Sequence, residues 1–141
     1  MKKKIIIRAP KGFRTKYRVS IYNNKIEYVY CQLYDTTKSP EVYAGNVEIE
    51  HAYGRIYKTH GNLKSEYYNR GLGTLLYAKI IAWGFNHGFK VQSSSDSSEM
   101  AKRVWDGKGL RKYFNIKKIV DKNYNNKDIE TWYPSRKRKS K

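Results

Sequence analysis

Two glycines stand one residue apart, directly after an arginine, at the point where a helical pattern begins. They belong to the stretch RGLGT, residues 70–74, and from Leu72 onward apolar residues recur at spacings of three and four until Gly88. This pattern predicts an amphipathic helix that opens on the glycines. The first N–H groups of a helix are unpaired and partly positive, and glycine lets an anion approach them because it has no Cβ. The chemistry indicated is the binding of a diphosphate group.

The glycine pair alone leaves two interpretations open, since Gly-x-Gly at a turn between strand and helix also serves tight packing. The pattern does not match the dinucleotide-binding fingerprint, because the position three residues after Gly73 is Leu76. It also lacks the Gly-Lys-Ser/Thr of a P-loop. A diphosphate ligand of another class is therefore the functional hypothesis.

Two stretches around these glycines resemble motifs of the GNAT N-acetyltransferases. Residues 63–77, LKSEYYNRGLGTLLY, are similar to motif A, whose common form is Val-x-Pro-x-Tyr-Arg-x-x-Gly-x-Gly-x-x-Leu, and residues 101–110, AKRVWDGKGL, resemble motif B, Ala-x-x-Leu-Tyr-x-x-x-Gly-Phe. The resemblance implies acetyl-CoA as the acyl donor, held by its pyrophosphate on backbone amides, with the preceding strand splayed from its neighbour to admit the pantetheine. The cofactor-binding residues that it implies are Leu63, Arg70, Gly71, Leu72, Gly73 and Thr74. Residues 95–105 are also similar to a stretch of short enzymes that are often phage-encoded.

The sequence departs from both motifs at informative positions. Tyr68 and Ser65 replace the usual Gln or Arg and the usual proline of motif A. Trp105 stands where many family members have a tyrosine that protonates the departing CoA thiolate, and an indole N–H is no acid at neutral pH. A thiol with a pKa of about 8.5 still leaves tolerably as its anion, so transfer does not require that acid.

Acetyl transfer to an amine needs a neutral amine, an aligned thioester and donors for the developing oxyanion. The candidate catalytic residues are Tyr57 and His60, on the strand before the glycine loop, and Asp96, before the second helix. Each has a structural alternative: Asp96 as the cap of a capping box and His60 as a turn residue. Glu48 and Glu50 lie on the neighbouring strand, exposed to solvent or near the site. No spacing of histidines and cysteine predicts a metal, and direct transfer without a covalent enzyme intermediate is the simpler scheme.

The net charge points to a polyanionic partner. Thirty Lys and Arg against twelve Asp and Glu give +18, with basic runs at both ends of the chain. Such an excess favours nucleic acid, so an amine carried on aminoacyl-tRNA or a modified DNA base is the expected acceptor, with a protein amine as another possibility. The alternative from another class is a non-catalytic, basic nucleic-acid-binding protein on a degenerate GNAT scaffold.

The elements expected to position these residues make a single α+β domain over residues 1–134 with a basic, disordered tail at 135–141. A mixed, mostly antiparallel sheet of about six to seven strands is expected with two main helices. The second helix is predicted to begin at Asp96 with Glu99. The expected strands are residues 3–9, 16–22, 25–34, 42–50, 55–63, 89–92, 113–120 and 128–132.

One cysteine, Cys31, allows no internal disulfide, which fits a reducing cytoplasm. The longest apolar runs fall far short of the roughly 20 residues that cross a bilayer, so no membrane partner is expected. The start MKKKIII ends its apolar part after three residues, which favours a strand over a signal peptide. The sequence leaves the oligomeric state open.

Overall fold

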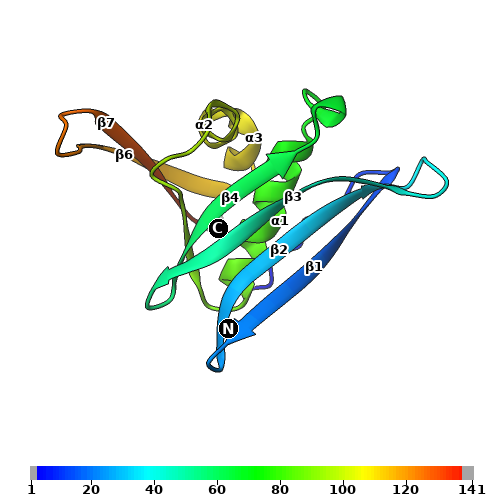
Figure 1. Ribbon diagram of the computed structural model, residues 1–141, viewed down its shortest axis with the longest axis horizontal. Helices are drawn as coiled ribbons and strands as arrows, with labels where there is room; N and C mark the ends of the chain where they lie inside the picture. Colours follow the sequence, from blue (N-terminus) through cyan, green and yellow to red (C-terminus); the bar gives the residue numbers. More distant parts are fainter. Residues whose placement is uncertain (1–2, 138–141) are drawn as a thin grey trace.

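The computed structural model describes residues 3–137 and contains seven strands arranged in two sheets (Figure 1). Strands β1 to β5 form one sheet in that spatial order, antiparallel except for the parallel pair β4 and β5, and β6 and β7 form a separate hairpin. The elements in chain order are β1 (Phe13–Tyr22), β2 (Lys25–Asp35), β3 (Val42–Tyr53), β4 (Ile56–Leu63), the 3-10 turn η1 (Ser65–Tyr67), α1 (Leu72–Asn86), β5 (Lys90–Ser93), α2 (Glu99–Asp106), α3 (Lys108–Arg111), β6 (Phe114–Lys122) and β7 (Asp128–Arg136). The expected α+β class is confirmed, with the strands divided five and two.

Alternation along β2 divides the large sheet into a buried face and a partly exposed face. Val29, Cys31 and Leu33 are fully buried, while Tyr28 and Tyr30 keep part of their surface exposed. Because successive side chains of a strand point to opposite faces, the first set packs toward α1 and the second points away from it. Figure 1 shows α1 crossing behind the strands of this sheet.

The turn between β1 and β2 is the two-residue hairpin that the sequence predicts. Asn23 and Asn24 both have positive φ, 51° and 62°. Those angles suit a type I′ turn, whose twist matches that of the flanking strands, and asparagine tolerates them better than most residues. The chain therefore passes from β1 to β2 with no intervening helix.

The start of α2 differs from the prediction. Ser98 is the N-cap, and its hydroxyl accepts a hydrogen bond from the N–H of Ala101 at 3.2 Å. Asp96 cannot cap the helix because α2 begins three residues later, at Glu99, and its carboxylate is hydrogen-bonded to the Ser94 hydroxyl instead. The predicted capping box is wrong.

Residues 3–9 have no regular secondary structure and are not a strand of the sheet, contrary to expectation. The Asn86 side chain binds both the N–H and the carbonyl of Ile5 at 2.8 Å, and the Lys79 ammonium donates to the Ile7 carbonyl at 2.7 Å. Side chains of α1 thus satisfy backbone groups that a neighbouring strand would otherwise pair. This segment is fastened to the helix.

The tail predicted to be disordered begins, in the structure, with two residues that belong to a strand. Ser135 and Arg136, expected in the tail, belong to β7, and the Arg136 guanidinium donates to the carbonyls of Lys3 and Phe85. Of the remaining residues of the predicted tail, Lys137 follows β7 and is exposed, and residues 138–141 lie outside the described residues. No helix within residues 3–137 is long and apolar enough to cross a membrane.

Candidate active site

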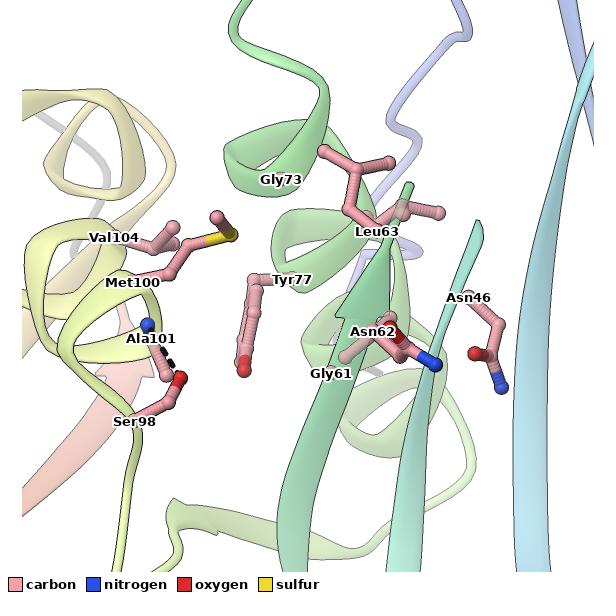
Figure 2. A pocket seen from close by; sticks show the side chains of 12 residues that line it. Asn46, Gly61, Asn62, Leu63, Gly73, Tyr77, Ser98, Met100, Ala101 and Val104 are labelled. Atoms are coloured by element: carbon pink, nitrogen blue, oxygen red, sulfur yellow. Dashed lines mark hydrogen bonds between the residues drawn. The ribbon is translucent and has the colours of Figure 1, made fainter. Parts of the chain in front are cut away.

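The two parallel strands of the large sheet diverge beside the glycine loop. β4 pairs with β5 only over Ile56–Thr59, opposite Lys90–Ser93. Over residues 60–63, β4 pairs with β3 on one side only, so its other edge presents unpaired backbone groups. After β5 the chain turns away into α2, which stands across the gap from this open edge (Figure 2). The splayed strand pair that the sequence resemblance implies is present.

A narrow pocket occupies the gap between the open edge of β4 and α2. Gly61 and Leu63 line it from β4, Tyr77 from α1, and Met100 and Val104 from α2. Figure 2 shows the Tyr77 ring standing between β4 and α2, with Met100 beside it. The pocket volume is about 30 Å³, close to the space of one water molecule. Any group larger than a water molecule must displace or repack the side chains of Tyr77 and Met100.

A larger pocket of about 400 Å³ opens at the N-terminus of α1 and shares lining residues with the narrow one. The shared residues are Leu63, Gly73, Met100 and Val104. The remaining lining comes from the glycine loop and α2: Tyr68, Asn69, Gly71, Leu72, Thr74 and Arg103. The two pockets therefore adjoin, one at the helix N-terminus and the other at the open strand edge, and we refer to the pair as the channel.

The helix N-terminus at this channel has free amides and open space. Gly71 is the N-cap, with a φ of 74°, and no side chain caps the helix. The hydrogen bond from the Leu75 N–H to the Gly71 carbonyl closes the first turn. A Cβ on Gly71 would meet nothing within 4 Å, and a Cβ on Gly73 would lie 3.5 Å from Val104, an ordinary contact. Packing within the chain thus does not require glycine at position 73. The space that the glycines leave is available to a diphosphate, and no carboxylate lines it.

Arg70, predicted to bind the pyrophosphate, lies on a different side of the loop. Its guanidinium lies 5.2 Å from the ring centroid of Phe13 and 5.5 Å from that of Tyr67, and it lines a neighbouring groove. The cation at the amide pocket is Arg103 of α2, which the sequence reasoning missed. The sequence feature that could have identified Arg103 is its position three residues after Met100, which puts both on the face of α2 that meets the glycine loop.

The structure brings together two of the three predicted catalytic residues. His60 lies on the unpaired part of β4, with its Nε2 3.5 Å from a carboxylate oxygen of Glu50. The pKa of Asp96 is lowered, chiefly by the hydrogen bond from Ser94 and further by the nearby charges of His60 and Lys58. His60 is exposed on the part of β4 that β5 does not pair, and Asp96 lies in the connection between β5 and α2.

Tyr57, the third predicted residue, is only 3% exposed and lies in the paired half of β4. Its hydroxyl donates to the Ile26 carbonyl, and burial raises its pKa. The structure places this phenol in a packing role at the opposite end of the strand from the glycine loop.

Carboxylates and tyrosines gather on the exposed sheet face near His60. Glu48 lies opposite His60 in the strand register and opposite Tyr30 on the other side. Burial raises the pKa of Glu48; the charge of His60 opposes this shift and the charge of Glu50 adds to it. The Tyr28 hydroxyl donates to Glu50 at 3.2 Å. The surroundings of His60 are therefore acidic, in contrast to the chain as a whole.

Trp105, at the motif B tyrosine position, is a core residue with no exposed surface. Its ring stacks on Trp132 at a centroid distance of 6.5 Å and meets Tyr77 edge-on at 5.8 Å. Tyr77 is the phenol that lines the narrow pocket, although sequence reasoning assigned it only to the apolar stripe of α1. Burial raises the pKa of Tyr77 to about 12, so it stays protonated at neutral pH.

No family model and no curated protein match this sequence. Solved structures do match its fold: a spermidine N-acetyltransferase variant from Vibrio cholerae has 10% identity and a TM-score of 0.58 over 88% of this chain and 94% of that one. A cAMP-binding acyltransferase from Mycobacterium smegmatis has 11% identity and a TM-score of 0.53 over 77% of this chain and 31% of that one. A GNAT-family acetyltransferase from Streptococcus pneumoniae has 18% identity and a TM-score of 0.48, and this chain covers 66% of it. At these identities the first two similarities show that this chain shares its fold with those acyltransferases, and no more.

Proposed function

We propose that this chain is an acetyl-CoA-dependent N-acetyltransferase that transfers acetyl directly to an amine. The observation that carries the proposal is the channel from an uncapped, glycine-opened helix N-terminus to the open edge of β4. Bound acetyl-CoA would supply an acyl group activated as a thioester.

The donor side of the channel offers groups suited to a diphosphate followed by an extended arm. The amides at Leu72 and Gly73 would hold the diphosphate, with the Arg103 guanidinium beside them. Beyond them, the unpaired backbone of Gly61 and Leu63 offers strand-type hydrogen bonds to an amide-containing chain. Backbone N–H groups at this edge would also stabilise a developing oxyanion.

The acceptor side offers a base and counter-charges for an amine. His60 would take the proton from the attacking amine, with Glu50 at 3.5 Å to hold the imidazole and Asp96 nearby. Burial raises the pKa of Cys31 to about 12, so this thiol is not a nucleophile at neutral pH. The proposal is therefore direct transfer. Tyr77 supplies the narrow pocket with a proton donor that Trp105 does not.

We infer that the acceptor amine is carried by an anionic macromolecule, with nucleic acid first, as aminoacyl-tRNA or a modified DNA base, and a protein amine second. A net charge of +18 would concentrate a polyanion at the surface. The carboxylates around His60 would then select the amine within that polyanion. The net positive charge of the chain would thus attract the polyanion from a distance, and the carboxylates around His60 would bind the amine at close range.

A non-catalytic nucleic-acid-binding function is the second candidate. The absence of a phenol at position 105 and the replacement of the motif A ligand by Tyr68 favour it. In that case the basic surface would act alone, and the channel would be an inherited feature without a ligand.

Calorimetry with acetyl-CoA and with desulfo-CoA separates the two candidates. Binding of both, followed by a mass increase of one acetyl group on a tRNA, DNA or protein pool, supports the enzyme. Tight, salt-dependent binding of nucleic acid by a chain that ignores both CoA species supports the non-catalytic protein.

A further inference from the structure

A second groove borders the first turn of α1, between the N-terminal segment and α3. Its volume is about 390 Å³, and its charged lining residues are Arg8, Arg70 and Lys112. We refer to it as the cationic groove and define it by these three side chains. It is distinct from the amide pocket, whose cation is Arg103.

The three cations of this groove have no acidic partners within residues 3–137. None of them forms a salt bridge there, and no Asp or Glu lines the groove. Arg70 is held in place by the rings of Phe13 and Tyr67. Like charges gathered without counter-charge repel one another, so an anion bound among them removes that repulsion. The groove has the composition of an anion site.

The cationic groove and the amide pocket meet at the same turn of helix. Gly71, Leu72 and Thr74 line both. α3 packs closely there, since a Cβ on Gly109 would lie 2.6 Å from the Thr74 methyl group, and this contact sets Lys112 beside the turn. A ligand whose diphosphate lies on the amides therefore reaches the cationic groove by extending past Gly71.

We infer that the cationic groove binds the 3′-phosphate of the adenosine end of coenzyme A. The inference rests on the proposed function, because it requires the diphosphate of the same molecule at the α1 amides. A phosphomonoester carries a charge of about −1.5 to −2 at neutral pH and three acceptor oxygens. Arginine matches those oxygens with paired N–H donors, and lysine adds a point charge. Arg8, Arg70 and Lys112 supply both kinds of contact in one place.

Calorimetry of the full chain with coenzyme A and with 3′-dephospho-coenzyme A tests the inference, since the two ligands differ only in that phosphate. Coenzyme A should bind at least about tenfold more tightly, given the strength of charge-assisted hydrogen bonds. Arg8→Gln and Lys112→Gln should each weaken coenzyme A several-fold and leave the dephospho ligand unchanged. The double variant should bring the affinity ratio close to one.

Two matched variants serve as controls. Arg103→Gln, at the amide pocket, should weaken both ligands by the same factor. Lys117→Gln, an exposed residue of β6, makes the same change in net charge and should alter neither affinity.

Equal affinities for the two ligands in the wild-type chain would overturn the inference while leaving the proposed function intact. An equal loss of affinity for both ligands in the double variant would also overturn the inference, because the groove would then act only through the long-range electrostatic field of its charges and not on the 3′-phosphate. If the ligands bind equally and the double variant loses affinity for a single-stranded oligonucleotide, the groove is a nucleic-acid contact instead. Binding of neither ligand refutes the proposed function, and the inference with it.

Discussion

Replacing Gly73 with aspartate tests the helix N-terminus as a phosphate site, because its predicted effects on stability and on binding have opposite signs. Gly73 is the second residue of α1 and has no positive φ. A Cβ there would contact Val104 at 3.5 Å, so the fold accommodates a side chain. The new carboxylate would occupy the space where the diphosphate is proposed to lie.

The expected magnitudes follow from this position. Glycine in a helix is about 0.3 kcal/mol less favourable than aspartate, and a negative charge in the first turn contributes about 0.3–1 kcal/mol, so Gly73→Asp should stabilise the chain by about 1 kcal/mol. That corresponds to a rise in Tm of about 3 °C for a chain of this size. Repulsion between the carboxylate and a diphosphate charge roughly 4 Å away is about 4 kcal/mol at an effective dielectric constant of about 20. Even half of that, allowing for solvent, lowers the affinity about thirtyfold.

Thermal unfolding and calorimetry with acetyl-CoA measure the two effects on the same samples. Asn115→Asp, at an exposed position of β6, makes the same change in charge and should leave the acetyl-CoA affinity unaltered. An acetyl-CoA affinity within threefold of wild type in Gly73→Asp would refute the assignment of these amides. A fall in Tm of 5 °C or more would show instead that the glycine serves packing.

Three further substitutions test other features. The oxyanion donors proposed at the open edge of β4 would put the acyl group in the narrow pocket, which Met100→Ala should enlarge, so calorimetry should show the affinity for propionyl-CoA rising relative to acetyl-CoA; an unchanged ratio would contradict that position of the acyl group. Ser98→Ala removes the N-cap of α2 and should lower the free energy of unfolding by about 1 kcal/mol in urea titrations, whereas no change would mean that another residue caps the helix. Burial lowers the pKa of Lys79, so the unfolded state binds more protons and the wild-type chain should gain stability over Lys79→Met as pH rises toward the ordinary lysine pKa of about 10.4; a constant difference in urea unfolding between pH 7 and 10 would refute this.

The sequence was most informative where one local pattern decides the structure. Alternation along β2 and the asparagine pair at 23–24 predict a hairpin with Val29 and Cys31 inside, and both features are present. The change after Gly71 to apolar residues at spacings of three and four likewise predicts α1 almost to its ends. In these cases the same residues determine both the backbone conformation and the burial of a segment, so the local sequence is sufficient to predict it.

The sequence was least informative where a distant side chain decides the outcome. Residues 3–9 have the composition of a strand, but Asn86 and Lys79 satisfy their backbone groups from a helix more than seventy residues away. Asp96 has the chemistry of a cap, but Ser98 stands at the helix start. Which side chain binds a given backbone group depends on the groups that the fold brings near it, and a local sequence pattern does not contain that information.

The geometry of the candidate site was more predictable at the N-terminus of α1 than at the open edge of β4. The glycines at 71 and 73 mark the N-terminus of α1, where the diphosphate is proposed to bind. The roles of Tyr77 and Arg103 depend on which elements face each other across the gap between β4 and α2, and that arrangement is a property of the fold. Tyr57 shows the converse, since its position on the correct strand does not bring its hydroxyl to the gap.

The two-residue connection at Asn23 and Asn24 has a consequence for the choice of acceptor. Because β1 passes directly into β2, no helix between these strands lies over the sheet face that carries Tyr30 and Glu48. Within residues 3–137 the face beside His60 is an open platform rather than an enclosed chamber. A platform admits a bulky molecule lying flat across it, and selectivity then depends on a pattern of charges and rings matched over an extended footprint rather than on the exclusion of large molecules by size.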